Sequence, residues 1–449
     1  MAFTFIDLFA GIGGFHAALE ALGGKCVYAV EINEAAAKVY ETNWGINPLG
    51  DITKDVSEEG VKVPNHDVLV AGFPCQPFSK SGAQRGMEET RGTLYWNILK
   101  IIEIRKPALV ILENVRNLTG PRHAHEWKVI IETLREQGYQ VSDTPAIFSP
   151  HLLPPEMGGR PQVRERVFII AVKIPKRNKS ISTGTEPAVT NQPANGWNPM
   201  LWDLESHLPL DEDHTVLGCD LSKQEMLWIN AWDDFVRGMR KRLNGNRLPG
   251  FPIWGDEWRL TKSLRFPEGT PEWKKDFLRK NAALYTEHKE FIDKWTKKWD
   301  FYSEKFPASR RKLEWQAQET PSLWETVMHF RPSGIRAKRP TYLPALVAIT
   351  QTSIIGSRKR RLSVREAARL QGLPEWFSFG DQSDKDSYKQ LGNGVSVGAV
   401  WHVIRTTVGQ NSEVFQKTCP DLVQCVKSSS KNPDTALRKI KPSNRSKKN

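Results

Sequence analysis

The pattern of apolar and polar positions divides this chain into two regions. From residue 3 to about 172, short apolar runs alternate with stretches whose apolar residues repeat at helical spacing, which is typical of a sheet covered by helices. From about 175 to 335 this alternation is lost, and a polar segment rich in Thr, Pro and Asn at 176–198 predicts a linker. We therefore predict an α/β domain and a second, smaller domain of different construction.

The first apolar run leads into a glycine turn and then a helical stretch, at 3–22. This arrangement is typical of nucleotide sites, because glycines let the backbone approach the ligand and the helix N-terminus faces it. The spacing, Asp-x-Phe-x-Gly-x-Gly-Gly, differs from the G-x-G-x-x-G of dinucleotide enzymes. Glu31 ends the second predicted strand, where a carboxylate can accept from a ribose diol; a solvated strand end is the alternative. Asp51, in a third turn, is placed to accept from an adenine amino group.

A cysteine lies directly after the predicted strand at 68–72. Cys75 stands between Pro74 and Pro77 in a rigid loop, and Glu113 follows the next buried strand. Ligands of open α/β sheets bind at the carboxyl ends of strands, so this thiol is placed like a nucleophile. The alternative is a small buried apolar thiol.

Three long polar side chains recur at every second position before the apolar run at 167–172. They are Gln162, Arg164 and Arg166, which share one face if the chain is extended there. Beside a candidate active site they suggest a clamp for an anion or a base; a surface strand with solvated arginines is the alternative.

These groups together indicate a reaction class. Acyl transfer of the serine type needs a histidine base, and no histidine stands at a comparable position. A thiolate with an acid and guanidinium groups suits conjugate addition to an electron-poor ring. With a nucleotide-type glycine loop and acceptors for adenosine, methyl transfer from S-adenosylmethionine becomes the natural chemistry.

Charge and cysteine content narrow the class of partner. The 449 residues include 64 Lys and Arg against 51 Asp and Glu, a net charge of +13, which favours nucleic acid first and an anionic membrane second. No apolar run approaches the roughly 20 residues of a membrane span, and the chain opens on a strand-like segment, so we expect no signal peptide. The five cysteines form no CxxC pair, so we expect no metal site, no disulfide framework and a cytoplasmic location.

Tryptophan gathers in the second region. Eleven of the sixteen tryptophans lie from Trp197 to Trp324, interleaved with Lys and Arg. Such aromatics can stack on nucleic acid, but filling an irregular core is the interpretation we favour for most of them. The last segment, 427–449, is rich in Ser, Lys and Asn without an apolar period, and we predict a disordered basic tail.

Several motifs of the sequence resemble those of a known protein family. They are DLFAGIGGF at 7–15, GFPCQPFS at 72–79, ENV at 113–115, QVRER at 162–166, RLSVREAARLQGLP at 361–374 and YKQLGNGVSVG at 388–398. In sequence and order they resemble DNA cytosine-5 methyltransferases, of the kind found in bacterial restriction–modification systems. The resemblance covers most of the chain outside 175–335.

The resemblance implies a fold and partners. The fold would be a Rossmann-like S-adenosylmethionine-dependent methyltransferase sheet at 1–174, with a smaller target-recognition domain at 175–335. Residues 336–410 would return to the first domain, supporting the recognition domain and packing a C-terminal helix. The substrate would be double-stranded DNA, the enzyme a monomer, and a cognate restriction endonuclease would act separately.

The resemblance also implies roles for single residues. Cys75 would add to C6 of a flipped-out cytosine, Glu113 would hold its exocyclic amine and N3, and Arg164 would support the ring oxygen. Arg166 completes the implied catalytic set. Implied substrate contacts are Gln76, Ser79, Ser81 and Gln162. Implied cofactor contacts are Asp7, Phe9, Gly11, Gly13, Gly14, Glu31, Ile32, Asp51, Ile52, Pro74 and Asn393. Ile32 departs from the family pattern, since many relatives have a tryptophan there to stack on adenine.

Three other functions compete with this one. A tRNA cytosine methyltransferase shares the catalytic motifs, although the long second region speaks against it. A non-enzymatic DNA-binding relative would be expected to lose Cys75, Glu113 or the arginines, and all are present. A nicotinamide oxidoreductase disagrees with both the glycine pattern and the cysteine loop.

Overall fold

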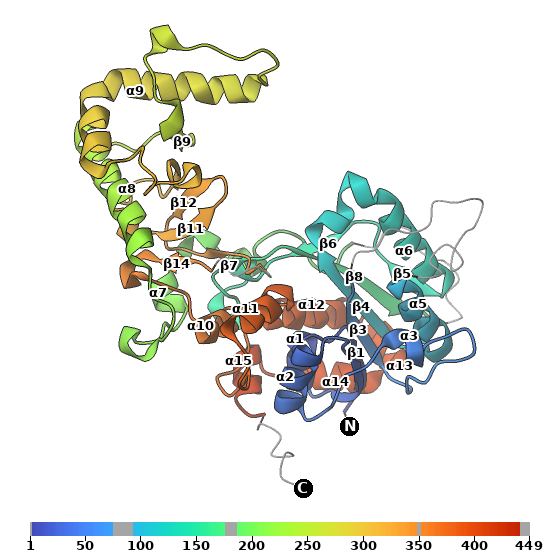
Figure 1. Ribbon diagram of the computed structural model, residues 1–449. Helices are drawn as coiled ribbons and strands as arrows, with labels where there is room; N and C mark the ends of the chain where they lie inside the picture. The colour runs from blue at the N-terminus through green and yellow to red at the C-terminus, as the bar shows by residue number, and fades with distance from the viewer. Residues whose placement is uncertain (1, 75–92, 176–185, 348–351, 441–449) are drawn as a thin grey trace.

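The protein has two lobes of unequal size (Figure 1). The computed structural model describes residues 2–74, 93–175, 186–347 and 352–440. The larger lobe is built on a seven-stranded sheet in the order β2-β1-β3-β4-β8-β5, with β6 also paired to β8. Its strands are β1 (Thr4–Leu8), β2 (Lys25–Val30), β3 (Val68–Gly72), β4 (Leu109–Val115), β5 (Tyr139–Val141), β6 (Ala146–Phe148) and β8 (Arg166–Lys173).

The sheet of the larger lobe is parallel from β2 to β4, and β8 runs antiparallel to β4. β3 and β4 are buried on both faces, as the continuous apolar runs predict for central strands. Because β1 to β4 are parallel, their carboxyl ends lie at one edge. The predicted Rossmann-like α/β sheet is therefore confirmed, and the chain following each of these strands is brought to that edge.

Helices cover both faces of this sheet. The core on one face includes side chains of α1 (Gly14–Ala21), α2 (Glu34–Trp44), α10 (Val364–Gln371), α11 (Asp384–Asn393), α12 (Val397–Gln410), α13 (Ser412–Thr418) and α14 (Pro420–Ser428). The core on the other includes side chains of α3 (Ile52–Asp55), α5 (Leu94–Arg105) and α6 (Ala124–Glu136). Elements from both ends of the chain thus share one core. Among the described residues, no helix is long and apolar enough to cross a membrane.

The smaller lobe has its own sheet and core. Six strands are ordered β15-β14-β11-β12-β10-β9. They are β9 (Ile253–Trp254), β10 (Lys312–Gln316), β11 (Val327–Arg331), β12 (Gly334–Lys338), β14 (Ile354–Ile355) and β15 (Arg360–Arg361). The long helices α8 (Lys223–Arg242) and α9 (Glu272–Trp299) cover it. Seven of the eleven tryptophans in this region belong to this core or pack against it, which confirms the interpretation of most of them as core residues.

The boundaries of the smaller lobe differ from the predicted 175–335. Its sheet continues through β12 and includes β14 and β15, so it extends to Arg361. In the other direction, Val189, Leu204 and Leu208 belong to the core of the larger lobe. The difference arises because β14 and β15 join the sheet through strand pairing, which the apolar pattern of two-residue strands does not reveal.

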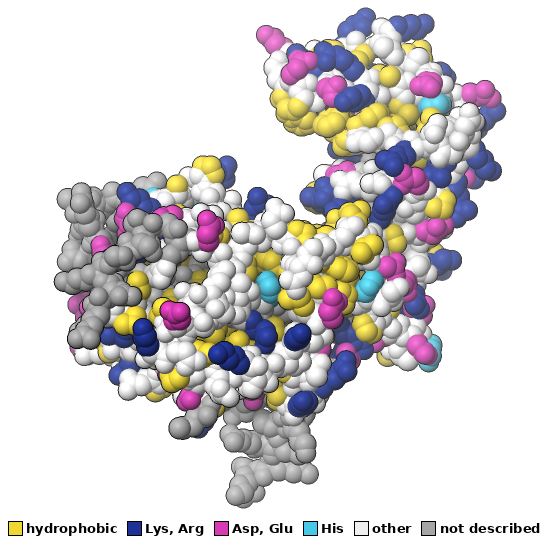
Figure 2. All heavy atoms as spheres, turned by 180° about the vertical axis from the view of Figure 1, so that it is seen from behind, with side chains coloured by type: hydrophobic (Ala, Val, Ile, Leu, Met, Phe, Trp, Pro, Cys, Tyr) yellow, Lys and Arg dark blue, Asp and Glu magenta, His cyan; other side chains and the backbone are white. Residues whose placement is uncertain are grey.

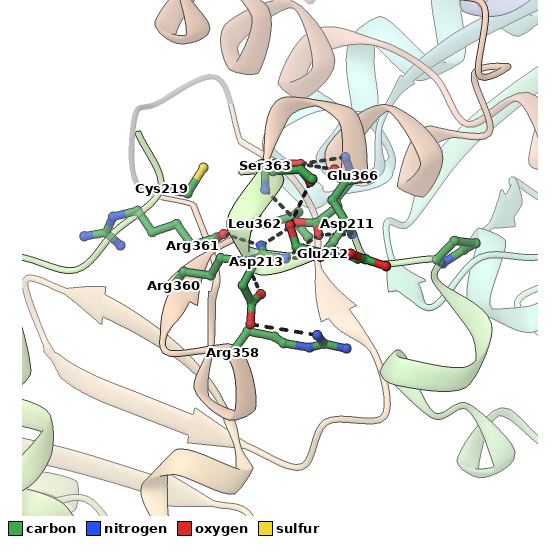
Figure 3. Close-up of polar contacts among 12 residues, drawn as sticks. Asp211, Glu212, Asp213, Cys219, Arg358, Arg360, Arg361, Leu362, Ser363 and Glu366 are labelled. Atoms are coloured by element: carbon green, nitrogen blue, oxygen red, sulfur yellow. Dashed lines mark hydrogen bonds and ion pairs between the residues drawn. The ribbon is translucent and has the colours of Figure 1, made fainter. Parts of the chain in front are cut away.

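A buried ionic network joins the two lobes (Figure 3). Arg360 of β15 bonds both carboxylate oxygens of Glu366 on α10, at 2.8 and 3.0 Å, and the two side chains are 4% and 0% exposed. Arg360 also pairs with Asp213, at 2.8 Å, on the segment that leads into the smaller lobe. Breaking a buried pair leaves a charge without compensation. This network therefore fixes the position of the smaller lobe relative to α10.

The predicted disordered tail is wrong for residues 427–440. α14 extends to Ser428 and a further short helix, α15 (Pro433–Leu437), follows. Pro433 and Leu437 are buried, and Asp434 pairs with Arg160 at 2.6 Å. This segment is held by two apolar residues four positions apart and by one ion pair. So short an apolar pattern is not apparent in a sequence of otherwise polar composition, and the helix was therefore not predicted. Residues 441–449 lie outside the described residues.

Candidate active site

A cavity of about 670 Å³ lies at the carboxyl edge of the larger sheet. It is formed by the segments that follow β1, β2, β3 and β4, together with the turn between α11 and α12. Its volume is in the range of pockets that hold small ligands and cofactors. Residues of the predicted site that line it are Phe9, Gly11, Gly14, Glu31, Pro74, Glu113, Arg166 and Asn393.

The glycine loop forms one wall of the cavity. Gly11 and Gly13 have φ values of 55° and 89°, in the left-handed region that favours glycine. A Cβ on Gly13 would lie 2.1 Å from Nε1 of Trp44, which itself donates to the carbonyl of Ile12 at 3.1 Å. The indole of Trp44 thus supports the loop from behind, and only glycine fits over it.

Glu31 holds the same loop from the end of β2. Its Oε2 accepts from the backbone N–H of Gly11 at 2.8 Å, and its Oε1 accepts from that of Asn33 at 2.7 Å. Each carboxylate oxygen has a second lone pair. Glu31 can therefore hold the loop and still accept from a ligand hydroxyl in the cavity.

The carboxyl group of Glu113 lies at the end of β4, in contact with an arginine. Nε of Arg166 is 2.9 Å from Oε1 of Glu113, and the side chains are 17% and 8% exposed. Burial raises the pKa of Glu113, while the charges of Arg166 and Arg164 act in the opposite direction. A carboxyl group whose pKa is raised keeps its proton to a higher pH, which suits it to act as a general acid.

Asn114 connects β4 to the segment after β3. Its Nδ2 donates to the carbonyl of Phe73 at 2.9 Å, and its Oδ1 accepts from the N–H of Val115 at 2.8 Å. Phe73 precedes Pro74, which lines the cavity. Asn114 therefore fixes where the chain leaves β3, immediately before the predicted nucleophile.

Arg164 lies behind the cavity, close enough to Glu113 for its charge to lower the pKa of that group. Its buried guanidinium donates to the carbonyls of Leu346, Gly392 and Gly394 and does not line the cavity. β7 (Gln162–Val163) ends before Arg164 and β8 begins at Arg166, and within this stretch Gln162 and Arg164 are both buried. Arg164 joins two segments of backbone, the one at Leu346 and the turn at 392–394, and of the two arginines only Arg166 lines the cavity.

Other predicted contacts also lie away from the cavity lining. Asp7 is fully buried on the face of β1 that carries Phe5, because side chains of a strand alternate. Gln162 is fully buried and pairs through β7 with β13 (Leu343–Pro344). Gly13 acts from behind the lining, as its contact with Trp44 shows. Further predicted contacts that do not line the cavity are Ile32, Asp51 and Ile52.

Four predicted site residues cannot be placed. Cys75, Gln76, Ser79 and Ser81 lie outside the described residues. The described chain reaches Pro74 at the cavity rim, so the site is described on all sides but this one.

Residues from α11 were missed by the sequence interpretation. Asp386, Lys389 and Gln390 line the cavity beside Asn393. Their spacing of three and four positions is a helical face, so the motif at 388–398 held the signal but only its glycine turn was used. The role of Trp44 was not predicted, because nothing in the sequence shows that an apolar residue at the end of a helix contacts a distant loop.

Comparisons with known proteins agree with this geometry. Residues 3–408 match the family described as C-5 cytosine-specific DNA methylase. The chain is 50% identical to Type II methyltransferase M.AluI of Cellulosimicrobium cellulans, over 93% of this chain and 94% of that protein. It is 42% identical to Type II methyltransferase M1.ScrFI of Lactococcus lactis subsp. cremoris, over 89% of this chain and 76% of that protein. With Type II methyltransferase M.HhaI of Haemophilus parahaemolyticus the identity is 44%, over 38% and 49%. The chain therefore belongs to the C-5 cytosine-specific DNA methylases, and it is a DNA cytosine-5 methyltransferase that uses S-adenosylmethionine.

Proposed function

We propose that this enzyme methylates C5 of a cytosine within one short sequence of duplex DNA, through a covalent bond from Cys75 to a base rotated out of the helix. The observation that carries the proposal is the buried Glu113–Arg166 pair, which lies in the same cavity as the glycine loop and Pro74. A base inside a duplex cannot reach such a recessed carboxyl group unless it leaves the stack.

The residues of the cavity fit S-adenosylmethionine. The open glycine loop offers backbone to the ligand, Glu31 retains acceptor capacity for a ribose, and Phe9 offers an apolar contact. When bound, this cofactor supplies an electrophilic methyl group. We also assign Ile32, whose side chain is 73% exposed next to Glu31, to an apolar contact with the adenine, and Asp51 and Ile52 to the same end of the cofactor.

The chemistry follows from the groups that face the base. The thiolate of Cys75 forms a bond to C6, the C5–C6 electron pair moves to C5, and the proton of the Glu113 carboxyl group passes to N3. C5 is then the nucleophilic carbon, and the bound cofactor would supply the methyl group to it, with the neutral thioether of the cofactor as the leaving group. Loss of the C5 proton to a base re-forms the double bond, expels the thiolate, and N3 returns its proton to Glu113. Arg166 holds the Glu113 carboxyl group in position throughout.

Arg164 takes a positioning role in this proposal. Its hydrogen bonds to Leu346, Gly392 and Gly394 hold the turn that brings Asn393 to the cavity. The contact with the ring oxygen that the sequence motif implies for Arg164 is a separate proposal, which rests on that motif alone. Gln76, Ser79 and Ser81 remain proposed substrate contacts on the strength of their motif alone.

The biological setting is part of the same proposal. The similarity to Type II methyltransferases over most of the chain supports a role as the modification enzyme of a restriction–modification system. A cognate endonuclease would then recognise the same sequence as a separate protein. We further propose that the enzyme acts as a monomer in the cytoplasm, where it meets its DNA.

Bisulfite sequencing tests the proposal. Plasmid DNA is grown in a host without DNA methylation that expresses either this chain or its Glu113→Gln variant. We expect protected cytosines in one short repeated context with the wild type, and protection lost or strongly reduced with the variant. Absence of protected cytosines in the presence of folded, cofactor-binding wild-type protein would contradict the proposal.

A further inference from the structure

The central strands of the smaller lobe have one apolar and one polar face. Side chains of a strand alternate between faces, and β10, β11 and β12 direct their apolar residues into the core beneath α8 and α9. The apolar set is Leu313, Trp315, Met328, Phe330, Ile335 and Ala337. We give the name basic face to five residues at the intervening positions: Glu314, His329, Arg331, Arg336 and Lys338.

The basic face is directed toward the larger lobe. Val327, which lies opposite Lys338 in the strand register, belongs to the core of the larger lobe. Nε2 of His329 lies 2.6 Å from Oγ of Ser353, and His329 shares a small cavity with Tyr388 of α11 and with Leu346. The carbonyl of Leu346 is the one that accepts from Arg164. The basic face thus continues into the structure that surrounds the active site, and Figure 2 shows the hollow between the two lobes.

The charges of the basic face do not balance. Glu314 bonds Arg336 at 2.7 Å and lies 3.6 Å from Arg331, so one carboxylate serves two guanidinium groups. The ammonium group of Lys338 has no hydrogen-bond or ion-pair partner within the described part of the chain, although its backbone is paired in β12. His329 adds no charge near neutral pH, since burial and the neighbouring cations lower its pKa to about 4. Among these five residues, three cations and one carboxylate leave an excess of two positive charges.

The arrangement is unfavourable in the protein alone. Lys338 is half-buried, and both its burial and the charges of Arg336 and Arg331 lower its pKa. Like charges held together by a rigid sheet repel each other, and an anion between them would relieve that repulsion. The DNA backbone supplies anions at regular intervals, and Lys and Arg are the usual partners of its phosphates.

We propose that the basic face of β10–β12 binds the phosphate backbone of the substrate DNA beside the active site, with Lys338 in direct contact with a phosphate and Arg331 next to it. The inference rests on the proposed function and deepens it, because it assigns to these residues the contacts that orient the duplex. An ammonium group on a flexible stem acts as a point charge and not as a reader of base edges. Lys338 therefore contributes affinity and register, and sequence selection lies elsewhere.

The salt dependence of DNA binding tests this inference. Lys338→Gln and Arg331→Gln are compared with Lys297→Gln, an exposed lysine on α9, on the opposite side of the same core. Dissociation constants are measured by fluorescence anisotropy at several salt concentrations, for one duplex that contains the methylated sequence and one that lacks it. Cofactor binding and thermal unfolding of each variant report on its fold.

Each lost phosphate contact should lower the slope of log K against log salt by about one unit. We expect that decrease for Lys338→Gln on both duplexes, with DNA bound several-fold more weakly, and none for Lys297→Gln. An unchanged slope in both basic-face variants that still fold, bind cofactor and methylate DNA would overturn the inference. So would weakening confined to the duplex with the methylated sequence. Failure of the wild type to methylate any duplex would instead contradict the proposed function, so the two failures are distinguishable.

Discussion

Nε of Arg166 lies 2.9 Å from Oε1 of Glu113, and both side chains are largely withdrawn from solvent at the edge of the parallel sheet. Burial raises the pKa of the carboxyl group, and the guanidinium limits that rise. The pair therefore combines a proton that can be donated with a fixed direction of donation. These two properties are what addition of a thiolate to cytosine requires of its acid.

Glu113→Gln should lower kcat by about 10²- to 10⁴-fold, the usual contribution of a general acid. The amide cannot donate the proton that N3 needs, while the shape of the site is retained, so the KM for DNA should change little. Tritium transfer from labelled cofactor measures both parameters. Glu165→Gln is the matched control, since Glu165 pairs with exposed Arg116 and does not line the cavity. Equal kcat values for the two variants would remove Glu113 from the catalytic set.

The pH dependence of the reaction should reflect the same pair. The rate requires Glu113 in its acid form, so kcat should fall as pH rises through the pKa of this group. Removing the Arg166 charge removes an effect that lowers this pKa. Arg166→Gln should therefore move the alkaline limb of the kcat profile to higher pH, besides lowering kcat. A limb that stays in place or moves to lower pH would contradict the assignment of the acid.

Gly13→Ala should abolish tight cofactor binding and destabilise the fold. The new methyl group would meet the Trp44 indole at 2.1 Å, and the positive φ adds about 1–2 kcal/mol of strain. Gly138→Ala is the control, because Gly138 has a φ of 85° but no atom within 4 Å of the added group. Calorimetric titration with cofactor and thermal unfolding should show a large loss for Gly13→Ala and only the strain for Gly138→Ala. Equal effects would mean that Trp44 does not support the loop.

The sequence indicated which residues follow the parallel strands at the edge of the sheet. It did not indicate which face of a strand each polar side chain occupies. Glu113, Glu31 and the glycine loop come together because parallel strands deliver their ends to one edge, which the apolar runs already indicate. Asp7 and Arg164 are buried and do not line the cavity at that edge. Their placement depends on strand parity and on a break between β7 and β8, and neither is visible in a pattern of polar residues.

The burial of the Asp7 side chain can be tested through the stability of the protein. Burial raises its pKa well above the ordinary value of 3.8, and this effect outweighs that of the backbone N–H of His16, which acts in the opposite direction. As pH rises above the ordinary value, the unfolded chain releases this proton while the native protein keeps it, so native stability decreases until the native pKa is reached. Asp7→Asn removes this dependence. Its Tm relative to wild type should therefore shift in favour of the variant from pH 5 to pH 8; a constant or opposite difference would place Asp7 in contact with solvent or a cation.

The second lobe shows a different limit of sequence interpretation. The sequence predicted that most of its tryptophans are core residues. It did not predict β14 and β15, because a strand of two residues can be recognised only from its pairing with other strands. Arg360 likewise reads as part of a basic cluster, whereas in the fold it is buried against Glu366 and Asp213. The sequence alone therefore does not distinguish a buried arginine that joins two lobes from a cation on the surface.

Covalent trapping tests the central claim most directly. A duplex that carries 5-fluorocytosine at the methylated position is incubated with enzyme and S-adenosylmethionine, and the denatured product is mapped by mass spectrometry. Fluorine replaces the C5 proton whose loss releases the enzyme, so the wild type should remain bonded through Cys75 to C6 of a base that has gained a methyl group at C5. Cys75→Ser should give no such product. Absence of the adduct from active wild-type enzyme, or attachment through another residue, would contradict the proposed mechanism.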